Sequence, residues 1–167
     1  MHYSETHLMI LALALILVAS IPSSMAGQRP PPLRTSDFLL HRIPDDADTS
    51  VVRHVLGAPD SISTGDDPSQ ASDNLPTWWY RDLHIVFADG RHVHGWWITG
   101  PSRATQRGLR VGAPRGDIQR LYGPPTLSSG DSTFTYREPR GGSHPRLIFI
   151  WVAAGRVRDL YIGRLID

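Results

Sequence analysis

The chain has 167 residues and contains no cysteine. Its 17 basic side chains are all arginine, and the 16 Asp and Glu residues leave a formal net charge of +1. So balanced a charge argues against nucleic acid or an anionic membrane as the partner. The lack of cysteine excludes disulfides and a lipid-bearing cysteine, so an exported fold would depend on its hydrophobic core alone.

The first element in chain order is a targeting segment. An apolar run over residues 8–19 precedes Ser24 and Ala26, which suit the −3 and −1 positions of a signal-peptidase site. The run is shorter than the roughly 20 apolar residues that span a bilayer. We therefore expect residues 1–26 to be a cleaved signal peptide and the mature protein to be periplasmic or secreted. Because residues 1–7 contain no Lys or Arg, a retained membrane anchor stays open as an alternative.

A helix and three strands are predicted after a proline-rich leader at residues 27–37. Residues 52–56 have the apolar spacing of a short helix, and Gly57 and Pro59 follow as helix-ending signals. The polar segment 60–76 indicates a loop. Three apolar stretches then indicate strands, with a Gly-containing turn at Asp89-Gly90 between the last two. They are residues 78–80, 83–87 and 93–97.

The same order of signals recurs in the second half of the chain. Residues 118–122 repeat the helical spacing before Gly123 and Pro125, and strand-like stretches follow at residues 134–136, 147–151 and 157–161. The sequence therefore predicts an α+β fold of two pseudo-repeated units, at residues 38–100 and 101–167. Each unit is expected to be a short helix followed by a three-stranded antiparallel meander.

These motifs resemble the BamE/SmpA/OmlA-like domain superfamily. The matching residues are 55–59 (helix end with Leu-Gly-x-Pro), 78–80 (Trp-x-Tyr), 85–87 and 90–93, and residues 108–112 are similar to the Gly-x-x-x-Gly segment that precedes such a helix. Two tandem copies resemble the architecture of the β-lactamase inhibitor protein. The resemblance implies a helix-plus-sheet layer that binds other proteins in the cell envelope or outside the cell. No partner-contact residue of the inhibitor can be matched, so inhibition is only an analogy.

Strand alternation predicts one face for the core and one for a partner. We expect Leu83, Ile85, Phe87, Val93 and Trp97 to point under the helices. The opposite face would then carry the candidate partner-binding residues, among which tryptophan is a typical interface anchor: Trp79, His84, His92, His94 and Trp96.

An alternative interpretation of this face remains open. In the second unit the same face would carry Ile148, Ile150, Leu160 and Ile162. Apolar residues on both faces of a sheet also suit two sheets that cover each other, in which case Trp96 would belong to the core.

A metal site is the second open alternative. His92 and His94 share a strand face, and His84 could supply a third ligand, but no Cys or Glu supports a zinc site. Signatures of a nucleophile elbow, a zinc protease or a P-loop are absent. We therefore expect no enzyme, no cofactor and no nucleic-acid partner.

The sequence predicts an exported, non-enzymatic protein-binding module of the envelope or extracellular space. Its partner and oligomeric state are left open. The rival hypotheses are a histidine-based metal-binding exported protein and a small hydrolase whose site cannot be connected by spacing.

Overall fold

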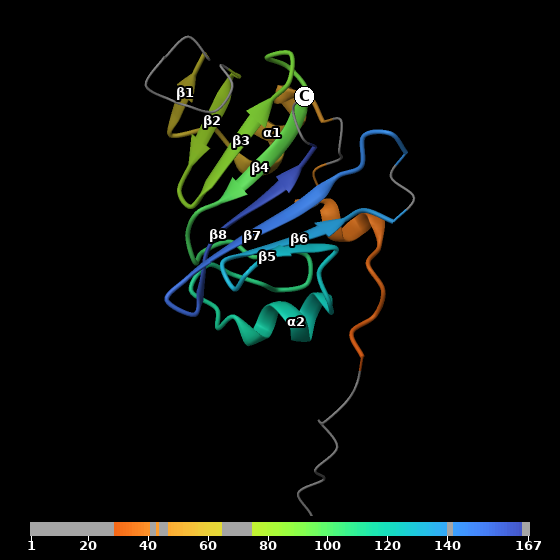
Figure 1. The fold of residues 1–167 in the computed structure, drawn as a ribbon. Coiled ribbons are helices and arrows are strands. Elements are labelled where there is room, and N and C mark those ends of the chain that lie inside the picture. The colour runs from red at the N-terminus through yellow and green to blue at the C-terminus, as the bar shows by residue number, and fades with distance from the viewer. Residues whose placement is uncertain (1–28, 41–42, 44–46, 65–74, 140–141, 165–167) are drawn as a thin grey trace, which may run out of the picture.

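The computed structural model describes residues 29–40, 43, 47–64, 75–139 and 142–164. The predicted signal peptide lies outside these residues. Within them, eight strands form one antiparallel sheet in the order β1-β2-β3-β4-β8-β7-β6-β5 (Figure 1). The strands are β1 (Ser61–Ser63), β2 (Thr77–Tyr80), β3 (Leu83–Phe87), β4 (Val93–Ile98), β5 (Leu127–Ser129), β6 (Thr133–Arg137), β7 (Leu147–Ala153) and β8 (Arg156–Gly163).

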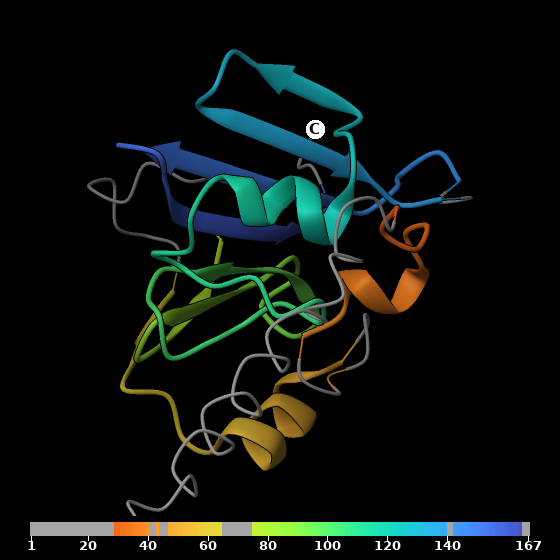
Figure 2. The ribbon, with the colours of Figure 1, turned by 90° about the horizontal axis from the view of Figure 1, so that it is seen from below.

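Two α-helices lie where the apolar spacing predicts them, α1 (Thr49–Leu56) and α2 (Gly116–Tyr122). Helix α1 begins after Asp48, whose carboxylate accepts hydrogen bonds from the backbone N–H groups of Ser50 (2.8 Å) and Val51 (3.0 Å). It ends at Gly57, as α2 ends at Gly123. A short 3₁₀-helix, η1 (Thr35–Phe38), lies beside one end of α2 (Figure 2).

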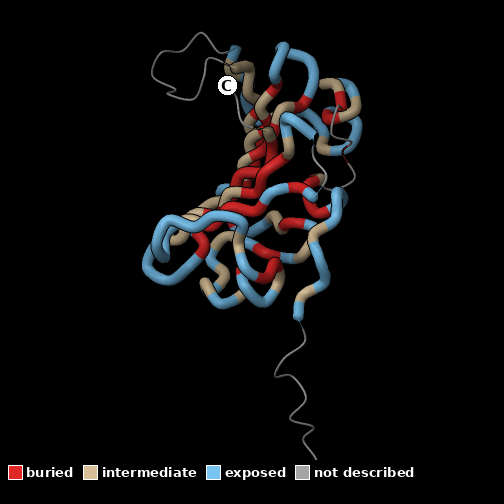
Figure 3. Tube along the Cα trace, turned by 45° about the vertical axis from the view of Figure 1, so that its right-hand side comes forward, coloured by how far each residue is buried: buried red, intermediate tan, exposed pale blue. Residues whose placement is uncertain are grey.

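Both helices contribute to one hydrophobic core on one face of the sheet. Val52 of α1 and Ile118 of α2 are fully buried. On strands, Tyr80 donates a hydrogen bond to the carbonyl of Gly57, at the end of α1, and Tyr136 donates to the carbonyl of Gly123, at the end of α2. Figure 3 shows the buried segments gathered along the strands, with exposed loops around them. The alternate residues of the strands therefore face away from both helices.

The predicted fold of two units, each a helix with a three-stranded meander, is wrong. Each predicted meander is preceded by a further short strand, β1 or β5, and all strands belong to one sheet because β4 pairs with β8. Residues of β1 and β5 are largely exposed and polar, so they carry no apolar alternation that a sequence could show. The β4–β8 pairing joins segments distant in sequence, which local patterns do not reveal.

Candidate binding face

The face of the sheet that points away from α1 and α2 carries no helix of the described residues, and we call it the helix-free face. Five aromatic or histidine side chains form a row across it. Direct register pairs connect them from strand to strand, Trp79 with His84, His84 with Trp97, Trp97 with Tyr161, and Tyr161 with Phe149. We call these five residues the cross-strand row. Each of them alternates along its strand with buried core residues, so the row points away from α1 and α2.

The register carries the row to the edge of the sheet. Phe149 pairs with Thr135 of β6, and Thr135 pairs with Leu127 of the edge strand β5. Leu127 is 69% exposed, the largest exposed fraction among the large apolar side chains in the part of the chain that the structure describes. The apolar surface therefore ends at an edge strand and leaves a leucine in contact with water.

Four rings gather at the centre of this face, and we call Trp97, Phe149, Trp151 and Tyr161 the aromatic cluster. The ring centroids of Trp97 and Trp151 are 5.0 Å apart and the rings are stacked, and Phe149 stacks on Trp151 at 5.7 Å. Tyr161 lies 5.1 Å from Trp97 and 6.2 Å from Phe149. Such contacts hold the rings in fixed positions, so little side-chain entropy remains to be lost when a partner covers them.

The hydroxyl end of Tyr161 lies directly against the backbone of two glycines. Gly95 of β4 and Gly163 of β8 are register partners, and a Cβ atom on either would lie 2.5 Å from the Tyr161 hydroxyl oxygen. No side chain fits in that space, so the hydroxyl end of the Tyr161 ring lies over the β4–β8 junction. Its hydroxyl donates a hydrogen bond to the carbonyl of Arg164 at 2.9 Å. The missing side chains thus fix the position of one ring of the aromatic cluster.

The predicted orientation of Trp96 is wrong. Trp96 is 2% exposed and belongs to the core, and its neighbour Trp97 takes the position on the helix-free face. The cause is a β-bulge, since Val86 pairs with Gly95 whereas Phe87 pairs with Val93, which leaves His94 as an extra residue on β4. An extra residue reverses the alternation on one side of a bulge. Val93 and Trp96 therefore face the core together.

The three candidate histidines lie in separate surroundings. The His84 ring contacts Trp79 in a tilted arrangement with centroids 3.8 Å apart, and burial holds the pKa of its imidazole below the ordinary value. The His92 ring contacts the Asp89 carboxylate at 2.6 Å, and Nε2 of His94 lies 3.1 Å from the carbonyl oxygen of Arg164. Within the described ranges, no three His, Cys, Asp or Glu side chains are grouped as metal ligands. Of the predicted site, Trp79 and His84 lie side by side in the cross-strand row.

Sequence reasoning missed the C-terminal members of the aromatic cluster. The expectation that Ile148 and Ile150 lie on the outer face left Phe149 and Trp151 for the core, but Ile148 and Ile150 are the fully buried residues of β7. Leu160 and Ile162, expected on the outer face, are fully buried as well. A shift of one residue exchanges the two faces of a strand. The unbroken run 147–152 offers no polar residue to show which alternate set is buried.

No family model matches the chain, and no curated protein matches it. A similar fold occurs in the crystal structure of an extracellular protein containing an SCP domain from Bacillus anthracis str. Ames, with a TM-score of 0.50 and 12% sequence identity. The match covers 82% of this chain and 49% of that chain, so this chain spans about half the length of that protein. At this identity the likeness concerns the fold alone.

These comparisons correct the family expectation. The similar solved structure contains an SCP domain, and the single eight-stranded sheet and two α-helices of the described residues differ from the helix-plus-meander repeat of the BamE/SmpA/OmlA-like superfamily. The predicted resemblance is therefore wrong. An extracellular neighbour fits the expectation of an exported chain. The helices among the described residues are too short to cross a membrane.

Proposed function

We propose that this chain is an exported, non-enzymatic protein that binds another polypeptide of the cell envelope or the extracellular space. The contact surface is the helix-free face, with Trp97 and the rest of the aromatic cluster at its centre. The observation that carries the proposal is the cross-strand row, five rings in direct register over five adjacent strands, of which all but the buried Tyr161 are partly exposed.

The chemistry of the face favours a polypeptide as the occupant. Tryptophan and tyrosine supply large contact areas and recur at the centre of protein interfaces. The rings of Trp97 and Trp151 stack on each other, so they meet the solvent as a compact apolar surface. A contiguous apolar surface of this kind on a folded chain usually marks an interaction site.

The charges on the face define the partner further. On β8 the carboxylate of Asp159 is already bound by Arg158, with nitrogen and oxygen 2.7 Å apart. Arg137 of β6, which pairs with Leu147 beside the aromatic cluster, is exposed, and no carboxylate of the described residues forms an ion pair with it. A partner surface that is apolar at its centre and carries an acidic side chain opposite Arg137 would complement this face.

Export of the chain supports an envelope or extracellular partner. The apolar segment 8–19 with small residues at 24 and 26 has the form of a signal peptide, and the similar solved structure comes from an extracellular protein.

The proposal is tested by capturing the partner with a variant of the aromatic cluster and a control variant on the helix side of the sheet. The full chain, Trp97→Ala and Val55→Ala are each immobilised and exposed to envelope and culture-medium fractions, because Val55 is an exposed apolar residue of α1 on the helix side. We expect a polypeptide that binds the full chain and Val55→Ala but is reduced at least about tenfold on Trp97→Ala. The captured polypeptide is then identified, purified and titrated against all three proteins by calorimetry.

A second substitution protects the test from a folding defect. Phe149→Ala removes another ring of the aromatic cluster on a different strand, and near-UV circular dichroism confirms that each variant keeps its tertiary structure. If the purified polypeptide binds Trp97→Ala and Phe149→Ala as tightly as the full chain, the helix-free face is not the contact surface.

A further inference from the structure

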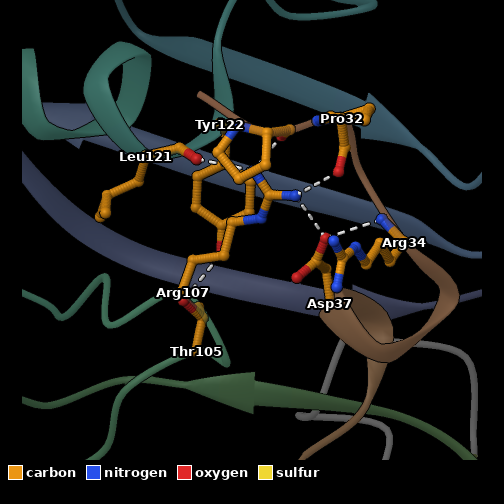
Figure 4. A network of polar contacts seen from close by, with 8 residues as sticks. Pro32, Arg34, Asp37, Thr105, Arg107, Leu121 and Tyr122 are labelled. Atoms are coloured by element: carbon orange, nitrogen blue, oxygen red, sulfur yellow. Dashed lines mark hydrogen bonds and ion pairs between the residues drawn. The ribbon is translucent and has the colours of Figure 1, made fainter. Parts of the chain in front are cut away.

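The guanidinium of Arg107 joins three separate segments of the chain (Figure 4). One terminal nitrogen donates hydrogen bonds to the carbonyls of Pro31 and Leu121, both at 2.8 Å. The other donates to the carbonyl of Pro32 at 2.8 Å and to the carboxylate of Asp37 at 2.6 Å. The Arg107 side chain is only 10% exposed, so these donors depend on protein acceptors and little on water.

The surface around Arg107 is built by the end of α2 and the preceding loop. The guanidinium carbon lies 5.5 Å from the ring centroid of Tyr122, and the Tyr122 hydroxyl donates to the side-chain oxygen of Thr105 at 2.6 Å. That oxygen also accepts the backbone N–H of Leu109 at 3.1 Å. The arginine is thus held over a buried aromatic ring that is itself fixed by hydrogen bonds.

The proline-rich leader contacts this surface mainly through its backbone carbonyls. Proline has no backbone N–H, and a proline-rich segment adopts an extended conformation with its carbonyls free to accept hydrogen bonds. Two consecutive carbonyls, those of Pro31 and Pro32, meet the two terminal nitrogens of the Arg107 fork. Pro30 packs against Gly123, where a Cβ atom would lie 3.2 Å from the Pro30 ring. A cavity of about 380 Å³ opens beside Pro31 and is lined by Arg34, Arg120 and Leu121, among others.

We propose that Arg107, Tyr122 and the end of α2 form a recognition site for an extended proline-rich polypeptide, which the chain's own Pro30–Pro32 segment fills in cis. The leader competes with such a segment in trans, so the site opens to a partner only when the leader is displaced. Displacement involves Pro31 and Pro32, both exposed, and none of the core strands. It frees one hydrogen bond of each terminal nitrogen, while Leu121 and Asp37 keep the Arg107 guanidinium oriented to bind another pair of carbonyls. This site is distinct from the helix-free face, and its test does not depend on that proposal.

The experiment uses a labelled peptide of sequence QRPPPLR, copied from residues 28–34, and a control peptide QRGGGLR of equal charge. Binding to the full chain is measured by fluorescence anisotropy and compared with a leader variant, Pro30→Gly/Pro31→Gly/Pro32→Gly. The tethered leader acts at an effective concentration of about 1 mM, so for an open site with a Kd of about 0.1 mM its loss should tighten peptide binding about tenfold. Adding Arg107→Lys to the leader variant should weaken binding at least about tenfold, because the charge remains but the two-pronged donor geometry is lost.

Each result supports the proposal or overturns it. Equal affinity of the full chain and the leader variant overturns it, and so does equal binding of the two peptides to the leader variant. If the triple variant fails to fold, Pro31→Ala replaces it, since the Pro31 carbonyl is kept while the extended conformation is less favoured. That variant should bind QRPPPLR more tightly than the full chain does, and no gain contradicts the proposal.

Discussion

The two halves of the sheet have the same order of elements but are held in place differently. In the N-terminal half, α1 precedes β1–β4, and in the C-terminal half, α2 precedes β5–β8. Two contacts correspond between the halves. A strand tyrosine donates to the carbonyl that ends the helix, at 3.2 Å from Tyr80 and 3.0 Å from Tyr136. An arginine also lies over an aromatic ring, Arg53 over Trp78 and Arg115 over Phe134.

The difference lies in polar contacts that are shielded from water. In the C-terminal half, Arg146 and Glu138 form a buried ion pair at 2.6 Å, and Arg107 binds Asp37 of η1. In the N-terminal half the corresponding contact among the described residues is the exposed one between the Asp89 carboxylate and the His92 ring. Equivalent elements are therefore stabilised unequally, because the leader and Arg107 pack against the end of α2 in the C-terminal half.

The largest expected effect is on stability, at β4, the strand that joins the two halves by pairing with β8. Trp96→Ala removes a fully buried indole on β4 and should lower the free energy of unfolding by about 3–5 kcal/mol. If the halves share one core, urea unfolding followed by circular dichroism and by amide exchange should lose both halves in one transition. Separate transitions for β1–β4 and β5–β8 would instead show that each half folds alone.

Two control variants show how much of the Trp96→Ala cost comes from the loss of core packing. Trp96→Phe keeps most of the volume and removes an indole N–H that has no hydrogen-bond partner among the described residues, so it should cost less than the alanine variant. Trp97→Ala, on the helix-free face, should cost less than half as much as Trp96→Ala.

The second effect concerns the buried ion pair of the C-terminal half. Arg146→Ala leaves the buried Glu138 carboxylate without its bidentate partner and should cost about 2–3 kcal/mol, measured by chemical denaturation. Arg120→Ala, which breaks an exposed pair with Asp117, should change stability by less than about 0.5 kcal/mol. Similar costs for the two variants would show that burial of the pair is unimportant.

The same ion pair predicts a loss of stability in acid. Hydrogen bonds from Arg146 hold the pKa of the Glu138 carboxyl below its usual value in the folded protein. The contribution to stability is therefore present above the unfolded pKa, about 4.3, and is lost as the pH falls through the lower folded pKa. Glu138→Gln should remove this part of the acid dependence, whereas an unchanged acid profile would contradict it.

The smallest expected effect is the loss of a tyrosine hydroxyl, and its cost in stability can be compared between Tyr136 and Tyr80. Tyr136→Phe leaves the carbonyl of Gly123 without its donor in a buried position and should cost about 1–2 kcal/mol. Tyr80→Phe removes the longer, less buried bond to Gly57 and should cost less than about 1 kcal/mol. Thermal unfolding of the two variants gives the comparison, and equal costs would contradict unequal stabilisation of the halves.

The stability measured at alkaline pH gives a further test of how deeply Tyr136 is buried. Burial raises the pKa of Tyr136 to about 12 in the folded protein. A raised pKa means that the neutral form contributes stability up to the unfolded pKa, about 10, and that this contribution is lost as the pH rises toward 12. Tyr136→Phe should flatten the stability profile between these values, while Tyr136 ionising near pH 10 would contradict the burial.

The sequence alone determined the local elements of this protein. The apolar spacing and the glycine stops located α1 and α2 because both signals act within a few residues. Alternation likewise placed Leu83, Ile85 and Phe87 in the core and Trp79 and His84 outside it. Those assignments depend only on the two-residue alternation within a single strand and not on contacts with other segments.

The tertiary structure decided which strands join and which face each residue takes. The β4–β8 pairing makes one sheet from two segments, and the bulge at His94 exchanges Trp96 and Trp97 between core and surface. The leader, which composition marks only as extended, is fixed by the Arg107 side chain. Register and side-chain contacts between distant segments depend on how the segments meet in space, and one inserted residue reverses the face of every residue beyond it.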